Sequence, residues 1–349
     1  MKSELNPENI YLQFNNGELD KKLALRLLTT LFKKNNIAFS YENLSLNLEI
    51  IKKIDQNFAQ SFVVDELNEI INFEPDIINY LGDVKWLPKC IDPLISLLLN
   101  CKTLLYMKQK FGNKFTYDAA TDENFLIKIT IRGINVKKIS DINGLKYLTG
   151  VVELYLINNN IEEIDLLENF TDLWILKLEN NHIKEIQSIK NLTHLTELSF
   201  KGNEISDISG LDNLESLSVL DLSKNKISEI KGLTDLPSLD ALNLSHNKIA
   251  EIKGLETLNL SKLFLSHNQI TEIKGIETLY LLKHLELQNN NIKVMEGLSN
   301  LKQLNYLDLR NNNISKIRRF GKNINHILLE GNQISKDDLS DFILSRKYN

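Results

Sequence analysis

Histidines are the side chains in this sequence that come nearest to a metal-binding pattern. His246 and His267 each stand directly before an asparagine, 21 residues apart, and His284 and His326 follow them. Equivalent positions on neighbouring strands lie about 4.8 Å apart, which would bring two imidazoles within reach of one metal ion. No cysteine and no carboxylate-rich segment accompanies them, and Ser-His-Asn is an ordinary filler of the repeat described below. We therefore predict neither a metal site nor a cofactor.

The sequence contains none of the common catalytic signatures. It has no phosphate-binding P-loop, no G-x-G-x-x-G after a strand, no His-Glu-x-x-His, no G-x-S-x-G and no EF-hand loop. Together with a repeat architecture that forms no deep pocket, this absence predicts a protein that is not an enzyme and has no catalytic residues.

Charge and hydropathy exclude several other classes. The 349 residues include 46 acidic and 41 basic side chains, for a formal net charge of -5, which argues against nucleic-acid binding. No apolar run approaches the roughly 18 to 20 residues that span a bilayer, and Glu4 and Glu8 flank a proline where a signal peptide would be apolar. With only two cysteines, Cys90 and Cys101, the composition favours a cytoplasmic protein outside the membrane.

These side chains sit within a repeat that organises most of the chain. From about residue 148 the phrase Leu-x-Leu-x-x-Asn-x-Ile-x-x-Ile recurs, with spacings of its asparagine of 22, 22, 22, 22, 21, 22, 22 and 20 residues. A fixed period of this length is typical of a solenoid, in which no single repeat can bury its apolar edge alone. The asparagine column consists of Asn159, Asn181, Asn203, Asn225, Asn247, Asn268, Asn290, Asn312 and Asn332.

Each part of the phrase predicts a local structure. Leu-x-Leu places two leucines on one face of a short strand, and Ile-x-x-Ile suits a 3₁₀-like or helical turn that returns the chain. The asparagine amide can donate to and accept from the backbone of adjacent coils, so we expect the column to form a structural ladder. Glycine before leucine, as at Gly232 and Gly254, fits a turn that requires φ > 0.

This phrase resembles the leucine-rich repeat family, in the 22-residue class shared by a regulatory subunit of type-1 protein phosphatase and the bacterial internalins. The resemblance covers about Leu126 to Ile334. It implies an α/β fold: a right-handed solenoid of about ten coils, with a parallel sheet on the concave side and short 3₁₀ or helical turns on the convex side. It also implies a scaffold that binds a protein partner. The first coil departs from the phrase because Ile134 occupies its asparagine position.

The flanking segments lack the period and predict helices. Residues 1–125 show helical spacing of apolar residues and read as an N-terminal all-α domain, either a second binding surface or a cap on the first coil. Residues 126–334 form the solenoid, and residues 335–349, with Asp337 and Asp338 in the first turn, predict a C-terminal capping helix. An alternative function is regulation in phosphatase or GTPase signalling, with the N-terminal helical domain as the effector element.

The concave face follows from the alternation of side chains in the strands. Its basic residues are Lys128, Arg132, Lys177, Lys201, Lys224, Lys262 and Arg310. Its acidic residues are Glu153, Glu179, Glu197, Asp221, Glu286, Asp308 and Glu330. Seven charges of each sign make a balanced mosaic that suits one protein partner better than a polyanion.

Exposed apolar residues on this face are candidates for partner binding, because folding does not require them there. One group lies near the start of the solenoid and one near its end; each group could instead pack against the flanking domain. We expect a monomer that binds its partner through Tyr155, Ile157, Ile175, Phe264, His267, His284, Tyr306, Arg310 and Leu328.

Overall fold

The structure is a computed structural model that describes residues 100, 103–104, 106–119, 127–186, 189–318 and 324–347. The helices predicted before residue 100 lie outside these residues. The described chain divides into two compact units: the first holds the residues up to Ile131 together with Ser140–Leu154, and the second holds Arg132–Ile139 and the residues from Tyr155 onward. No helix in the described part of the chain is long and apolar enough to cross a membrane.

The first unit contains one antiparallel strand pair. A 3₁₀ turn, η4 (Gly112–Lys114), leads into β1 (Phe115–Ala119), which pairs with β2 (Ile127–Arg132). Phe115 and its partner Ile131 are both fully buried. The buried Asn100 amide bonds Thr149 in both directions, since its Oδ1 accepts from the Thr149 N–H at 2.9 Å and its Nδ2 donates to the carbonyl at 3.0 Å.

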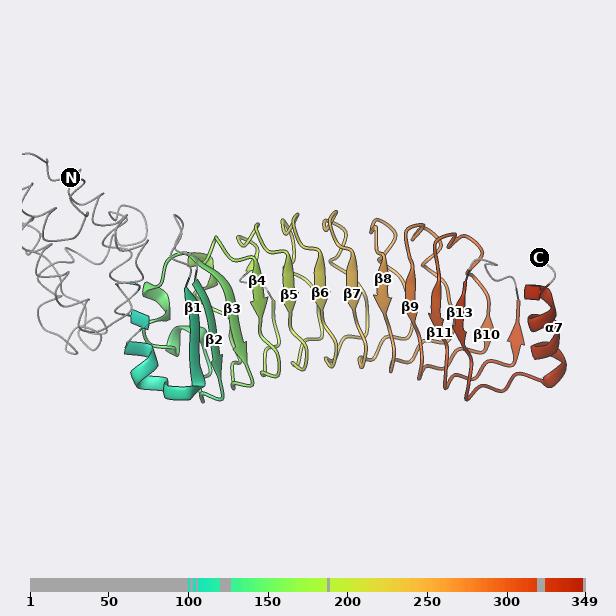
Figure 1. Ribbon diagram of the computed structural model, residues 1–349, viewed down its shortest axis with the longest axis horizontal. Coiled ribbons are helices and arrows are strands. Elements are labelled where there is room, and N and C mark those ends of the chain that lie inside the picture. The colour runs from blue at the N-terminus through green and yellow to red at the C-terminus, as the bar shows by residue number, and fades with distance from the viewer. Residues whose placement is uncertain are drawn as a thin grey trace, which may run out of the picture. The chain divides into compact units, whose positions relative to one another are not determined.

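The second unit stacks one short strand from each coil, as Figure 1 shows. From β4 to β9 neighbouring strands are consecutive in sequence and parallel, and the order continues β9-β11-β13. Strand β3 (Val151–Ile157) begins in the first unit and ends in the second. The other strands are β4 (Ile175–Lys177), β5 (Glu197–Ser199), β6 (Val219–Asp221), β7 (Ala241–Asn243), β8 (Lys262–Phe264), β9 (His284–Glu286), β11 (Tyr306–Asp308) and β13 (His326–Leu328).

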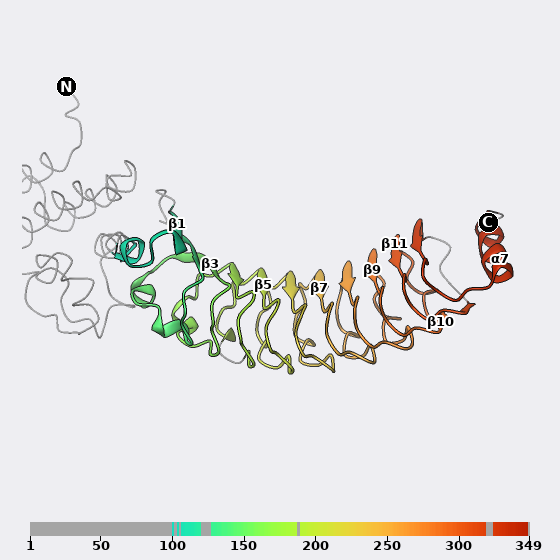
Figure 2. The same ribbon diagram turned by 90° about the horizontal axis from the view of Figure 1, so that it is seen from below.

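The leucine columns form the core of this stack. Leu242 on β7 pairs in register with Leu220 and Leu263 on the two neighbouring strands, and all three are fully buried. The strands line the concave side of the second unit and the return segments line the opposite side (Figure 2). The predicted leucine-rich-repeat solenoid is therefore confirmed.

The asparagine column bonds each coil to the one before it. The Asn247 Oδ1 accepts from the Ile227 N–H at 3.0 Å, and its Nδ2 donates to the carbonyls of Leu222 and Leu244, both at 3.0 Å. Leu222 and Ile227 belong to the preceding coil and Leu244 to the same coil, so one amide serves three buried backbone groups. The same acceptor bond recurs at every asparagine from Asn159 to Asn332, at 2.9 to 3.1 Å.

The return turns lie at a different place from the one the sequence predicts. Ile-x-x-Ile is not a 3₁₀ turn in these coils, because its backbone bonds the next coil: the Lys248 N–H donates to the Ile227 carbonyl at 2.8 Å. The 3₁₀-type bonds from residue i+3 to residue i occur instead in the Leu-x-x-Leu segment after the glycine, as from Leu258 N–H to Leu255 carbonyl at 3.1 Å. The early coils form full 3₁₀ turns, at η5 (Ile139–Asp141), η6 (Leu145–Tyr147) and η7 (Leu167–Asn169).

Glycine starts these turns in most coils because it adopts positive φ without strain, although Leu166 starts η7 with φ of 65°. Gly232 and Gly254 have φ of 76° and 79°, in the left-handed region that L side chains rarely adopt. A Cβ at Gly254 would also collide with the Ile230 carbonyl oxygen of the preceding coil. The glycine therefore permits both the turn and the close stacking of the coils.

The C-terminal end contains a second, two-stranded parallel sheet and a helix. Strand β10 (Val294–Met295) pairs with β12 (Lys316–Ile317), and α7 (Lys336–Lys347) packs against β12. The Ser335 Oγ caps α7 by accepting from the Asp338 N–H at 3.0 Å. The predicted capping helix is thus present.

We predict that Asn247→Ala destabilises the solenoid by about 2 kcal/mol, because it leaves the buried Ile227 N–H without a partner. The Leu222 and Leu244 carbonyls lose one donor each and keep a second one, from Asn225 and Asn268 respectively. Circular dichroism during urea unfolding would measure this as a lower denaturation midpoint. The matched control is Asn291→Ala, which removes an exposed side chain just outside the asparagine column. Equal losses of stability in the two variants would contradict a structural role for the ladder.

Candidate functional site

The concave face consists of the outward-facing residues of the strands. In each coil these stand six, four, two and one positions before the ladder asparagine; for Asn247 they are Ala241, Asn243, Ser245 and His246. They alternate with buried leucines because successive side chains of a strand point to opposite sides of the sheet. The face is therefore a grid in which one direction follows the strand and the other runs from coil to coil.

Phe264, His284 and Tyr306 form an aromatic cluster on three successive strands, β8, β9 and β11. The rings of His284 and Tyr306 stack with centroids 4.2 Å apart and planes only 4° apart. The Phe264 ring lies 5.2 Å from that of His284 and is tilted by 47°. Strand register explains the stack, since His284 and Tyr306 are paired residues of parallel neighbours. All three side chains are half-buried, so part of each ring faces solvent.

Polar bonds surround the aromatic cluster and hold its members in place. The Glu286 carboxylate contacts His284 Nε2 at 2.9 Å through Oε1 and accepts from Gln288 Nε2 at 3.1 Å through Oε2. Arg310 donates to both oxygens of the Asp308 carboxylate, from Nε at 3.0 and 3.1 Å and from a terminal nitrogen at 2.5 Å. Burial, followed by the charges of Asp308 and Glu286, raises the pKa of the Tyr306 hydroxyl above its usual value. Tyr306 is therefore neutral at physiological pH.

His246 and His267 stack on neighbouring coils but do not converge on a metal position. Their rings are 4.0 Å apart and within 10° of parallel, so the nitrogen lone pairs, which lie in the ring planes, run side by side. His267 Nε2 contacts Asn289 Nδ2 at 3.1 Å. Within the described residues there is no group of three or more His, Cys, Asp or Glu side chains that could hold a metal ion.

The charges around His246 are positive. Burial lowers the pKa of this imidazole most, and His267, Lys224 and Lys201 lower it further in that order. Each of those neighbours disfavours a second positive charge, which is the expected effect of a cationic environment.

Some charged residues of the concave face are bonded to a neighbour on that face, whereas three of its lysines form no ion pair within the described part of the chain. Lys128 pairs with Glu153 at 3.1 Å, Lys177 with Glu197, and Arg310 with Asp308. Glu179 accepts from the Ser199 hydroxyl at 3.0 Å. By contrast, Lys201, Lys224 and Lys262 form no ion pair with any described residue.

The predicted partner-binding residues separate into distinct places. Phe264, His284 and Tyr306 come together in the aromatic cluster, with His267 and Arg310 exposed beside it and Leu328 half-buried on β13. The early group lies elsewhere: Tyr155 and Ile157 on β3 and Ile175 on β4, all half-buried.

Two exposed apolar residues near the strands do not appear among the sequence candidates. Val219 is 37% exposed on β6, and Trp174 is 51% exposed immediately before β4. Val219 occupies an outward position of β6, but its side chain is small beside those of the aromatic candidates. Trp174 stands one residue before Ile175, the first outward position of β4, and the sequence pattern considered only the outward positions.

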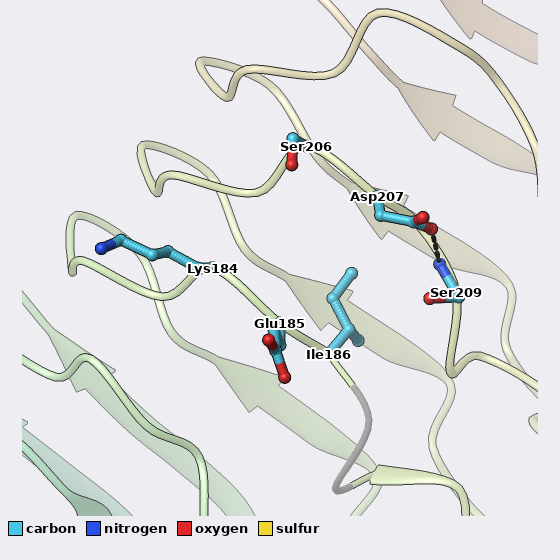
Figure 3. A pocket seen from close by; sticks show the side chains of 6 residues that line it. All are labelled: Lys184, Glu185, Ile186, Ser206, Asp207 and Ser209. Atoms are coloured by element: carbon cyan, nitrogen blue, oxygen red, sulfur yellow. Dashed lines mark hydrogen bonds between the residues drawn. The ribbon is translucent and has the colours of Figure 1, made fainter.

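A small pocket lies on the return side of two coils, lined by Lys184, Glu185, Ile186, Ser206, Asp207 and Ser209 (Figure 3). Asp207 is already engaged, since it accepts from the Ser209 N–H at 2.9 Å and pairs with Lys231 at 3.1 Å. These bonds lower the pKa of the Asp207 carboxyl. Asp207 is therefore held by structural bonds, whereas Lys184 and Glu185 line the pocket as exposed side chains.

Comparison with protein families matches the coils to two repeat descriptions. "Leucine rich repeat" covers residues 209–249, and "Leucine Rich repeats (2 copies)" covers residues 175–213 and 281–321. A search of the curated proteins finds no match.

Solved structures with similar coils include two internalins of Listeria monocytogenes. Internalin C2 is 28% identical over 52% of this chain and 80% of its own, with a TM-score of 0.48. The internalin inlF is 25% identical over 68% of this chain and 79% of its own, with a TM-score of 0.47. TLR13 in its complex with ssRNA13 is 26% identical over 52% of this chain and 27% of its own, with a TM-score of 0.46. Because these scores are below 0.5, the fold assignment rests on the repeat and its hydrogen bonds.

We predict that Lys224→Gln raises the pKa of His246, because removing a neighbouring cation favours the protonated imidazole. An NMR titration of the imidazole resonances would measure it, with Lys248→Gln, an exposed lysine outside the concave face, as the control. A pKa that stays the same or falls in the Lys224 variant would contradict the positive environment.

Proposed function

Because the coils of this chain are leucine-rich repeats, we propose that it is a non-enzymatic scaffold that binds a protein partner on its concave face. The proposed anchor is the aromatic cluster of Phe264, His284 and Tyr306.

The arrangement of the aromatic cluster carries this proposal. Three rings from three coils lie together with their faces partly open to solvent, although the core of the solenoid is complete without them. Aromatic residues surrounded by charged groups are the typical composition of the energetically dominant centre of an interface. Folding alone offers no reason to gather them on an outer surface.

Rigidity supports the same proposal. The side chains around the cluster are already bonded: Glu286 to His284 and Gln288, and Arg310 to Asp308. The strands beneath them are fixed by the register of the stacked coils. A surface that is ordered before binding loses little conformational entropy when the partner arrives, so a few anchor residues give useful affinity.

The proposal concerns a protein partner rather than a nucleic acid or a substrate. The net charge of -5 opposes phosphate-backbone binding. The two cysteines favour a reducing, cytoplasmic location, and we propose a monomer as the binding form. The alternative of a signalling regulator acting through its N-terminal helical domain concerns residues outside those that the structure describes, and stays a prediction.

We predict that Phe264→Glu/Tyr306→Glu abolishes partner binding without unfolding the chain, because it places charges where the apolar rings would be desolvated. The measurement is affinity capture from a lysate of the source organism, with quantitative mass spectrometry of the retained proteins. Circular dichroism establishes that the variant is folded, and Phe264→Ser/Tyr306→Ser repeats the test without added charge.

The matched control is Tyr280→Glu/Leu281→Glu. These residues are 60% and 44% exposed and lie in the turn before β9, outside the concave face. A protein that wild type and control retain and both cluster variants lose is the expected result. Retention of the same proteins by all variants would refute the concave-face proposal.

A further inference from the structure

We propose that the concave face binds an acidic segment of its protein partner, through a run of cations that begins at Lys201 and ends beside the aromatic cluster. This run, the cationic row, includes Lys201, Lys224, His246 and His267, which stand one or two positions before the ladder asparagines of four successive coils. It also includes Lys262 at the start of β8, in the same coil as His267. Its charge comes from the three lysines. The inference rests on the proposed function and adds the chemistry of the partner.

The first argument is charge pairing. The sequence gives the concave face equal numbers of acidic and basic residues, but the structure pairs them unevenly. Most acidic side chains of the face are bonded to cations, to hydroxyls or to backbone, as Glu197 is to Lys177 and Glu179 to Ser199. Lys201, Lys224 and Lys262 have no anionic partner among the described residues.

Two acids of the face lie within the same coils, and they do not cancel the positive charge. Glu197, on β5, is already paired with Lys177 of the preceding coil. Asp221, on β6, uses Oδ1 to accept from the Ser223 N–H at 2.8 Å. Three lysines against Asp221, the one acid of these coils that the face leaves without a cation among the described residues, give an excess of positive charge.

The second argument is backbone conformation. The residue immediately before the ladder asparagine has positive φ in every coil from Asn158 to Gly331. Six of these nine residues are asparagine or glycine, which tolerate this region best. The three exceptions are consecutive, at Lys224, His246 and His267, with φ of 55°, 57° and 55°.

Placing lysine in the left-handed region has a conformational cost that asparagine or glycine would reduce. Such costs are retained at functional positions more often than elsewhere. The run of larger, basic side chains therefore marks these coils as different from the rest of the column.

The third argument is the surface beneath the cationic row. Ser223, Ser245 and Ser266, which stand just before Lys224, His246 and His267, are buried and small. Such small residues add little bulk beside Lys224, His246 and His267, so an extended chain has room to approach these longer side chains. Four coils at about 4.8 Å spacing cover about 14 Å, the length of roughly four extended residues.

The row ends at the aromatic cluster, because Lys262, Phe264 and His267 belong to one coil. A segment with about four acidic residues followed or preceded by apolar ones would therefore match both features at once. Burial, followed by His267, Lys224 and Lys201, lowers the pKa of His246, so this imidazole contributes as a hydrogen-bonding group while the lysines supply the charge. Complementary charge of this kind sets the register and the specificity of an interface.

The first test uses the full chain and fluorescent octapeptides of known sequence. The acidic probe has four glutamates followed by Gly-Phe-Leu-Phe, and a second probe has the reverse order. A neutral probe replaces glutamate with glutamine, and a twelve-nucleotide oligouridylate tests the other polyanion. We expect one acidic probe to bind about tenfold more tightly than its neutral counterpart at low salt, with the difference shrinking as salt is added. Equal binding of acidic and neutral probes, or tighter binding of the oligouridylate, would overturn the inference.

Charge reversal locates the site. Lys201→Glu/Lys224→Glu should weaken the acidic probe by about tenfold. Lys248→Glu/Lys293→Glu, which changes the net charge equally at exposed positions off the face, should leave it nearly unchanged. Equal losses in the two variants would mean that only the overall charge matters.

A second variant separates binding from folding. Lys224→Asn restores the residue type that fills this column in other coils, so its melting temperature should equal or exceed that of wild type. Its affinity for the acidic probe should nevertheless fall by about threefold. A less stable variant, or one that binds as wild type does, would contradict the argument from backbone conformation.

Different experimental results would refute the acidic-segment inference and the proposed concave-face function. A captured partner that Phe264→Glu/Tyr306→Glu loses but Lys201→Glu/Lys224→Glu retains would uphold the concave-face function and refute the acidic segment. A partner unaffected by either variant would refute both.

Discussion

The hydrogen-bonding demand of the backbone is the constraint on which this structure depends. A coil of 22 residues is too short to satisfy its own buried N–H and carbonyl groups with a helix or a long strand. The ladder asparagines supply the missing partners, since one amide bonds a turn of its own coil and two groups of the preceding coil. Only when those groups are satisfied can the leucine columns pack without leaving polar atoms unpaired in the core.

The repeat also separates the residues of each coil into those that fold and stack the coils and those that face outward from the sheet. Leucine, isoleucine, asparagine and glycine occupy the positions that fold and stack the coils, and four outward positions remain. Those positions vary in size and charge from coil to coil, from Ala241 to Lys262 to Tyr306 along a single row of the sheet. The scaffold tolerates this variation, so the composition of the outward rows is where a binding surface can be specified.

The sequence predicts the structural features that recur in every coil, but it does not predict features that depend on contacts between particular residues of neighbouring coils. The period indicates the strands and their stacking, because each arises from residue types at fixed spacing. The acidic first turn at Asp337 and Asp338 separately indicates the C-terminal helix. The period misplaces the 3₁₀ turns, since bonds such as that from Lys248 to Ile227 hold Ile-x-x-Ile against the next coil. A count of charges likewise gives a balanced concave face, while the pairing of Lys177 with Glu197 and the isolation of Lys224 depend on geometry that a count does not contain.

In the proposed complex the two features of the concave face act over different distances. Unpaired lysines act on an approaching acidic segment across roughly a Debye length, about 8 Å at physiological salt, so they govern encounter and orientation. The rings of Phe264, His284 and Tyr306 contribute only at contact, when water leaves their faces, so they govern how long the complex lasts. Because the cations lie on one side of the rings along the stack, a partner docked in the reverse direction would place its acidic residues beside Glu286 and Asp308. The order of the coils thus specifies a direction of binding as well as a site.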